Sequence, residues 1–319
     1  MNIELLIQSG SKLYQPIVEE GIQWTTERTG SPSILKFTVV KDQDISFQEG
    51  DAVRMKVDGQ NVFYGFVFKK KRNKNHHIEV TAYDQLRYLK NKDTYVYDNK
   101  TASQIIQMIA NDFNLNLGKI ESTKHVIPSR TEDNQTLFDI IQTALDLECQ
   151  NKGELYCLYD DFGSLTLQNI ASMKLDILIN EESAEDFDYT SSIDDQTYNQ
   201  IKLMYANDES GERDVYMSKD TANQNQWGVL QYFEKLQEGE DGQSKADALL
   251  QLYNKKTRNL KVNNCFGDVR CRAGTMVLVN LKLGDIDVSN YLLVEKATHT
   301  FQKDEHFMSL NLRGGEFIV

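Results

Sequence analysis

The sequence predicts a mainly β protein of the α+β class, in which two similar β-barrel domains flank a small inserted α/β domain. Two observations support this prediction. A pattern of strand, glycine turn, long strand, charged turn and final strand occurs twice, over residues 50–83 and 274–312. Between the two copies, the spacing of apolar residues changes from the two-residue period of strands to the 3.6-residue period of helices.

The first copy begins at Gly50. Apolar and polar residues alternate from Val53 to Val57, and the chain then turns at Asp58-Gly59, a dipeptide typical of tight hairpins. A long strand returns from Val62 to Phe68, and a polar link leads to a last strand over residues 78–83. The pattern predicts a three-stranded meander.

The second copy begins at Gly274 and follows the same plan. It alternates from Val277 to Leu281, turns at Gly284, returns from Tyr291 to Phe301 and closes from Phe307 to Leu312. We expect the initial glycine of each copy to supply a positive φ before the first strand. A chain with two such units can place them as equivalent wedges around one axis, so a homotrimer would present six and form a ring.

The segment between the copies predicts two amphipathic helices and a hairpin. Thr101 to Gln104 matches a capping box and is followed by apolar residues at helical spacing, which predicts a helix over residues 102–113. Thr136 opens a second such segment. Residues 155–167 alternate on both sides of a turn at Asp160 to Gly163 and predict a β-hairpin.

These patterns predict three domains: a first barrel at 1–95, an inserted α/β domain at 96–180 and a second barrel at 181–319. A further helix is expected near residues 244–258, capped by Ser244 and packed on the second barrel.

Composition excludes several classes of protein. The net charge of −13 disfavours direct nucleic-acid recognition, because such a protein must neutralise phosphates. No apolar run approaches the roughly 18 residues of a membrane span, and the N-terminal residues lack the features of a secretory signal. We therefore expect a soluble protein made in the cytosol. The four cysteines lack zinc-finger spacing and are expected to be reduced and structural.

Charge is unevenly distributed along the chain. Residues 176–195 contain eight acidic side chains and no basic one, whereas residues 69–74 are strongly basic. Three interpretations remain open for the basic run: a nucleic-acid patch or anionic docking site, a solvated hairpin tip, or a surface that meets the acidic segment across a subunit boundary. The candidate interface residues from these segments are Lys69, Lys70, Lys71, Arg72, Glu181, Glu182 and Asp186.

Trp24 and Arg28 are two further candidates for a subunit interface. Spaced four residues apart, they are hypothesised to form a cation–π pair there. The alternative is that Trp24 belongs to the core, where large aromatic side chains are usually buried.

The sequence shows no catalytic constellation, and we assign no catalytic, cofactor-binding or metal-binding residue. The pair His76-His77 lacks metal-site spacing, and His299 and His306 are expected to form a surface pair across the final hairpin. The adjacent acids Asp160-Asp161 and Glu181-Glu182 could be taken for catalytic carboxylates. Neighbouring residues on a strand or turn point apart, however, and do not converge on one bond.

Several long stretches resemble the XkdQ/YqbQ-type proteins of PBSX-like prophages, a family distantly similar to the late control protein D family. They span nearly the whole chain: Gly21 to Val39, Val80 to Asn91, Leu155 to Leu167, Phe187 to Asp194, and Phe266 through Gly274 to Gly315.

This resemblance implies a baseplate hub of a contractile phage tail or phage-tail-like bacteriocin, made in the bacterial cytoplasm and assembled into the tail baseplate. In such hubs, two tail-tube-like barrels per subunit build a pseudo-sixfold ring from a trimer. The ring joins the tail tube, or a tube-initiator protein, to the central spike and supports tube assembly beside other baseplate proteins. The resemblance supplies no catalytic residues.

Two other functions remain open at this stage. The first is a tail-tip wall-degrading enzyme whose site uses Asp160, Asp161, Glu181 and Glu182. The second is a receptor-binding or carbohydrate-binding module at the periphery of the particle. We expect the hub, since the duplicated β-unit and the absence of a catalytic pattern both favour an assembly role.

Overall fold

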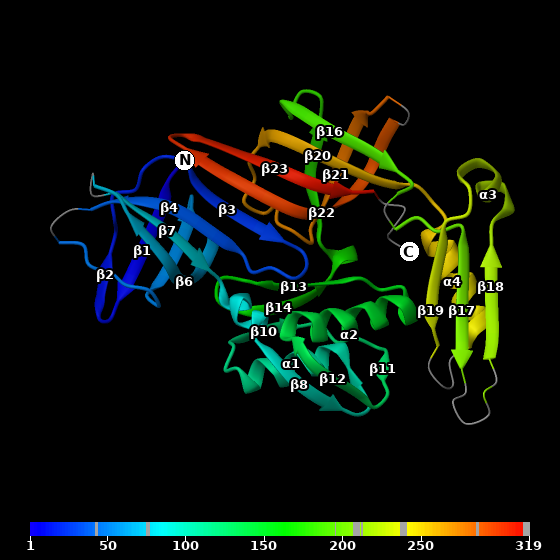
Figure 1. The fold of residues 1–319 in the computed structure, drawn as a ribbon. Helices are drawn as coiled ribbons and strands as arrows, with labels where there is room; N and C mark the ends of the chain where they lie inside the picture. Colours follow the sequence, from blue (N-terminus) through cyan, green and yellow to red (C-terminus); the bar gives the residue numbers. More distant parts are fainter. Residues whose placement is uncertain are drawn as a thin grey trace. The chain divides into compact units, whose positions relative to one another are not determined.

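The computed structural model describes residues 1–41, 44–74, 77–194, 196–206, 211, 213–236, 241–284 and 287–314. Contacts divide the chain into two compact units (Figure 1). Unit 1 contains Met1–Asp188 and Lys261–Val319, and unit 2 contains Tyr189–Leu260. We describe each unit by itself.

Most of unit 1 is built on a 13-stranded sheet, counted over the described residues, of which β16 and β20 also contain residues of unit 2. Its path runs β16-β20-β23-β22-β3-β4-β7-β6-β5-β1-β2, and β21, which pairs with β22, continues to β15. Its strands are β1 (Ile3–Ser9), β2 (Lys12–Tyr14), β3 (Ile22–Glu27), β4 (Ile34–Val40), β5 (Ala52–Val57), β6 (Gln60–Arg72), β7 (His77–Tyr83), β15 (Lys174–Asn180), β16 (Asp186–Ser192), β20 (Thr257–Phe266), β21 (Met276–Lys282), β22 (Asp287–Gln302) and β23 (Glu305–Arg313).

The two predicted copies appear in this sheet as the meanders β5-β6-β7 and β21-β22-β23, and the mainly β fold class is confirmed. Corresponding backbone bonds tie their first glycines to their long strands. Gly50 N donates to Val67 O and Gly274 N donates to Val294 O, both at 2.8 Å. Each long strand also has a register shift next to that valine. Closure of either half into a barrel stays a prediction.

The glycines that open the two copies have the predicted positive φ, +92° at Gly50 and +94° at Gly274. Their surroundings differ. A Cβ at Gly50 would meet no atom within 4 Å, whereas a Cβ at Gly274 would lie 2.4 Å from Cys157 Sγ. Gly274 is therefore required both by its backbone conformation and by the close approach of β13 (Tyr156–Asp160).

We expect Gly274→Ala to lower the free energy of unfolding by about 2 kcal/mol, and the matched control Gly50→Ala by about 1 kcal/mol. Both variants strain φ, but only Gly274→Ala adds a steric clash. Urea denaturation of the two variants measures the difference. Equal losses would show that the contact with Cys157 relaxes without cost.

The remainder of unit 1 is a layer of two helices and short strands around its own core. The helices follow the predictions: α1 (Ala102–Asp112) begins at a capping box of Thr101 and Gln104, and α2 (Leu137–Lys152) is capped by Thr136. In Figure 1 they lie beside the short strands. The other elements are the 3-10 helices η1 (Gln85–Lys90) and η2 (Ile170–Ser172) and strands β8 (Lys92–Tyr97), β9 (Lys100–Thr101), β10 (Leu117–Ile120), β11 (Val126–Ile127), β12 (Arg130–Thr136), β13 and β14 (Leu165–Asn169).

Unit 2 contains a three-stranded sheet in the order β18-β17-β19, with one helix packed against it. The expectation that this helix packs on the second barrel was wrong: Ala246 and Leu249 of α4 share a core with Ile201 and Leu203. Its cap is Asp241 rather than Ser244, because the Asp241 carboxylate accepts the Ser244 N–H. The elements are β17 (Gln200–Ala206), β18 (Arg213–Lys219), α3 (Thr221–Trp227), β19 (Gln231–Lys235) and α4 (Gly242–Tyr253).

The predicted three-domain division remains a prediction. Among the described helices, none combines the length and the apolar character that crossing a membrane would require.

Candidate assembly interface

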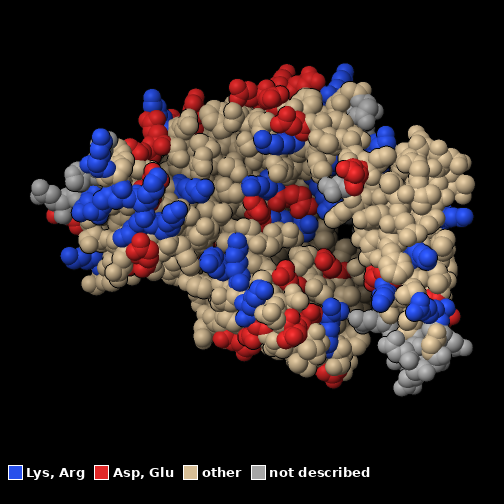
Figure 2. Space-filling view, viewed as in Figure 1, with Lys and Arg blue, Asp and Glu red and all other residues tan. Residues whose placement is uncertain are grey.

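The basic residues Lys69–Arg72 form the second half of β6 and pair with β7. The pairing continues through them to the end of the β6–β7 hairpin, a position that agrees with the interpretation as a solvated hairpin tip. Their role in a subunit interface stays a prediction. Lys69, Lys71 and Arg72 are exposed. In Figure 2, Lys and Arg side chains gather on the part of the surface formed by the N-terminal strands, at the left of the view. The sequence predicted that these charges cluster, and the strand pairing shows that they lie where β6 pairs with β7 beyond the end of β5.

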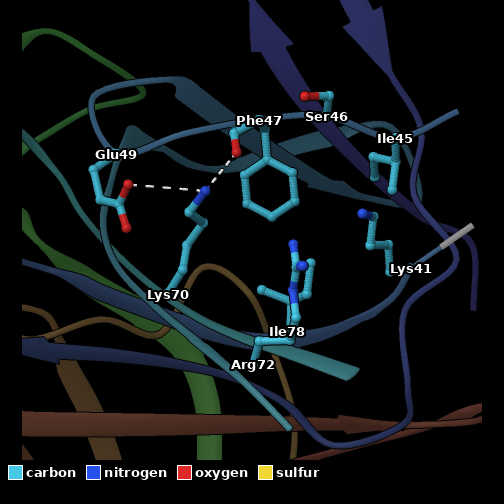
Figure 3. Close-up of a pocket in the computed structure, with 8 residues that line it drawn as sticks. All are labelled: Lys41, Ile45, Ser46, Phe47, Glu49, Lys70, Arg72 and Ile78. Atoms are coloured by element: carbon cyan, nitrogen blue, oxygen red, sulfur yellow. Dashed lines mark hydrogen bonds and ion pairs between the residues drawn. The ribbon is translucent and has the colours of Figure 1, made fainter. Parts of the chain in front are cut away.

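Lys70 turns toward a small hollow of about 310 Å³ beside β6 (Figure 3). Its Nζ donates to the Phe47 carbonyl and lies 3.8 Å from a Glu49 carboxylate oxygen. Lys41 and Arg72 also line this hollow. Lys70 is thus used within the chain, whereas Lys71 makes an exposed ion pair with Glu79 at 3.3 Å. Such a surface pair contributes at most about 1 kcal/mol, so it leaves Lys71 available to a partner.

The acidic candidates lie around the start of β16. Glu181 and Glu182 are exposed in the turn after β15, and Asp186 is the exposed first residue of β16. β16 is a terminal strand of the sheet among the described residues. The structure therefore places the acidic run at one end of the sheet path and the basic run on β6, and it brings no described pair of the two groups together within the chain.

Trp24 is a core residue, 2% exposed, as the alternative interpretation expected. Its indole N–H donates to Ser33 Oγ at 3.2 Å, and its ring stacks on His299 at 4.8 Å between centroids. Arg28 instead pairs with Glu295, with 2.7 Å between Nε and Oε2. Within the described part of the chain, no cation–π contact joins Trp24 to Arg28.

These two residues belong to a seam that joins the two copies, formed where β3 pairs with β22 over six residue pairs from Lys296↔Glu27 to Phe301↔Ile22. The Lys296 amine lies 2.7 Å from the Glu27 carboxylate across this seam. Both residues contact side chains of their own chain, and a role for them at a subunit interface stays a prediction.

His299 and His306 contact each other, but the expectation of a surface pair was wrong. His299 is fully buried: its Nδ1 lies 2.8 Å from His306 Nε2 and its Nε2 lies 2.7 Å from the Cys271 carbonyl. Burial lowers the pKa of His299 to about 3, with a smaller contribution from His306. Burial likewise lowers the pKa of His306 to about 4, against the opposing effect of Asp268. Both rings are neutral at pH 7.

Sequence reasoning missed a group of interacting charges formed by the buried carboxyls of Asp84 and Asp160 and the half-buried guanidinium of Arg272. Asp84 caps η1, accepting the Leu86 N–H, and it also accepts the Ser33 N–H, both at 3.0 Å. Burial and the charge of Asp160 raise the pKa of Asp84 well above its usual value. Burial also raises the pKa of Asp160.

The guanidinium of Arg272 opposes both of these pKa shifts. Its Nη1 donates to the Asp160 carbonyl at 3.0 Å, and the group stacks on the Tyr159 ring at 4.1 Å. This group connects the end of β7, the hairpin β13-β14 and the loop before β21. The one sequence signal was Asp84 itself, an aspartate before a short helical segment.

The carboxylates considered for catalysis are not arranged for it. The Asp160 carboxylate is buried and accepts from Gln85 Nε2 at 2.7 Å and from the Gly163 N–H at 2.6 Å. Those bonds hold the hairpin turn. Within the described ranges, no group of three or more His, Cys, Asp or Glu side chains is placed to hold a metal ion.

Comparison with known proteins agrees with this geometry. The phage-like element PBSX protein XkdQ of Bacillus subtilis is 29% identical over 320 residues, which cover 97% of this chain and 96% of that protein. The 43 kDa tail protein of prophage MuSo2 from Shewanella oneidensis has a similar fold, with a TM-score of 0.73 and 13% identity over 99% of this chain and 100% of that one.

A third similar structure is the E. coli c3393 protein, described as a type VI secretion component with structural similarity to T4 tail proteins gp27 and gp5. Its TM-score is 0.59, with 9% identity over 99% of this chain and 78% of that one.

The chain has the fold of these phage tail proteins. The YQBQ-like family model matches residues 22–313, and the chain belongs to that family.

Proposed function

We propose that this protein is the baseplate hub of a contractile tail, in which three copies form a pseudo-sixfold ring between the tail tube and the central spike. The observation that carries the proposal is the internal duplication. The two copies have the same strand order, corresponding glycine-to-valine backbone bonds and a bulge at the same position. Three chains with two equivalent units each present six units to a sixfold tail tube and three subunits to a threefold spike.

The proposed partners are other copies of this chain, the tube or a tube-initiator protein, the spike and further baseplate proteins. The fold similarity to c3393, whose description refers to gp27 and gp5, supports this choice. The proposed location is the tail baseplate of a virion or phage-tail-like particle, after synthesis in the bacterial cytoplasm.

An assembly role explains the site better than the two other candidate functions do. A wall-degrading enzyme needs two carboxylates set on either side of the bond to be cleaved. Asp160 is buried and holds a turn, whereas Asp161, Glu181 and Glu182 are exposed in turns. The structure gives no specific support to a receptor-binding module.

Deletion of the gene in the cell that encodes the particle tests the proposal. We expect electron microscopy to show loss of sheathed tails, or only disordered polysheath, because tube assembly would have no platform. Complementation with the wild-type gene should restore the tails. Intact tails of normal length that fail to infect or kill would contradict the proposal and favour a role after assembly.

The stoichiometry is a separate expectation. A particle reconstruction should show three copies of this chain around the tail axis. Six copies would contradict the pseudo-sixfold arrangement, because each chain already contributes two units.

A further inference from the structure

The seam inside the chain shows how one copy of the duplicated unit joins the next. One edge of β22 pairs with β23, from Leu293 onward. The opposite edge carries two strands in succession: β21 along Asp287–Leu293, then β3 along Lys296–Phe301. The second half of this long strand therefore receives a strand from the other copy.

The long strand of the first copy, β6, has the same construction with one strand missing. Phe66 of β6 is equivalent to Leu293 of β22. Phe66 pairs with β7 on one edge and with β5 on the other, and Leu293 pairs with β23 and β21 in the same way. Beyond the bulge, β7 continues along Lys69–Arg72, but β5 has ended. Within the part of the chain that the structure describes, no strand pairs with the second edge of Lys69–Arg72.

The strand equivalent to β3 in the second copy is β16. β3 and β16 occupy equivalent positions in the two halves of the sheet. In the first half the order is β3-β4-β7-β6, and in the second it is β16-β20-β23-β22. Their sequences correspond: Ile-Gln-Trp-Thr-Thr-Glu over 22–27 and Phe-Asp-Tyr-Thr-Ser-Ser over 187–192. β3 is paired on both edges, whereas β16 is the terminal strand of the sheet among the residues that the structure describes.

We propose that β16 of one copy pairs antiparallel with the free edge of Lys69–Arg72 of a neighbouring copy and closes the ring. This inference rests on the proposed trimer and names its contact. In the seam within the chain, Lys296 lies opposite Glu27 and Thr298 lies opposite Thr25. The same register, applied to the proposed contact, places Lys69 opposite Ser192 and Lys71 opposite Thr190. The contact is head-to-tail, which closes into a ring.

Charge complementarity supports this partner. In the transferred register, Lys71 lies diagonal to Asp188, a distance that long side chains span across strands. Asp186 and Asp194 flank the paired segment, and both are exposed in the subunit. In a chain of net charge −13, a strand edge with four consecutive cations is unusual, and the acidic β16 of a second copy is its match.

Disulfide cross-linking in assembled particles tests the pairing. The double variant Lys71→Cys/Thr190→Cys, expressed in the deletion strain and oxidised, should yield covalent dimers and trimers on non-reducing gels, with no larger species. Each single cysteine variant should yield none. A matched control is Lys12→Cys/Thr190→Cys, because β2 is the other terminal strand of the sheet path and offers the alternative edge.

The outcomes separate this inference from the proposed function. Cross-links in the control pair alone, or none in either pair while reconstruction shows three copies, would overturn the β16–β6 contact and leave the hub intact. Intact particles with a copy number other than three would overturn the ring itself, and the contact with it.

A charge exchange covers the case in which cysteine variants do not assemble. Ser192→Lys should reduce particle yield several-fold, since it faces Lys69 across the contact. Lys69→Glu in the same chain should restore the yield, by reproducing in reverse the ion pair of Lys296 with Glu27. A double variant no better than Ser192→Lys alone would contradict the register.

Discussion

Replacement of Arg272 by methionine is expected to lower the free energy of unfolding at pH 7.5 by about 1–3 kcal/mol, because the half-buried guanidinium donates a hydrogen bond to the Asp160 carbonyl and offsets the charge of two buried carboxyls. Arg272 is the cation that opposes the raised pKa values of Asp84 and Asp160. Without it, two buried carboxyls face each other with only N–H donors to compensate them. Methionine keeps most of the apolar contact with Tyr159, so the loss reports mainly on charge.

The pH dependence of this loss identifies its cause. A carboxyl whose folded-state pKa is raised favours folding at low pH, and this contribution is lost as pH rises through the folded-state pKa. Arg272→Met raises those pKa values further. The difference between the variant and wild type should therefore be smaller at pH 5 than at pH 7.5, where the carboxyls must ionise without their cation.

Urea denaturation provides the measurement, followed by the fluorescence of buried Trp24 in a Trp227→Phe background. The matched control is Arg270→Met, two residues away. Arg270 is 48% exposed and pairs with Asp176 and Asp268, each at 2.7 Å. Exposed pairs contribute little, so this control should change stability by at most about 1 kcal/mol. Equal losses at the two positions would refute the buried-network interpretation.

Acidification is expected to destabilise unit 1 through the buried histidines. A histidine with a lowered folded-state pKa takes up its proton on unfolding, so its contribution is present above pH 6.5 and is lost as pH falls toward the folded-state pKa. For His299, whose pKa is about 3, the loss between pH 7.5 and pH 5 is about 2 kcal/mol. His306 is partly exposed and should add less, for about 3 kcal/mol in all.

The free energy of unfolding at half-unit pH steps measures this effect. The variant His306→Gln removes one titrating ring and relieves its repulsion of protonated His299, so the slope between pH 6.5 and pH 5 should become shallower. A wild-type slope near zero in this window would show that the rings are protonated in the folded protein. An unchanged slope in the variant would assign the effect to other groups.

Local sequence determined many elements because their signals are short-range. Thr101 and Gln104 fix the start of α1 through hydrogen bonds within one turn, and Thr136 does the same for α2. Gly50 and Gly274 required positive φ because of their own turns. The mainly β class and the duplicated meander likewise followed from alternation along single strands.

Positions that depend on contacts distant in sequence were decided by the tertiary structure. His299 and Trp24 lie opposite each other although 275 residues separate them in the sequence. They are buried together because β3 pairs with β22. The charges of Arg272, Asp84 and Asp160 interact because the start of η1, the end of β13 and the loop before β21 converge, which no spacing in the sequence encodes. Helix α4, which contains Leu249, packs in unit 2 because the sheet of β17, β18 and β19 has an apolar face there.

The sequence alone thus determined the fold class, the repeat and the segregation of acidic and basic charge, since each is a local or compositional property. The tertiary structure determined on which strands these charged segments lie. Strand pairing placed the basic run on a half-paired strand and the acidic run on a terminal one, because β-sheet edges are defined only by which neighbours are present or missing.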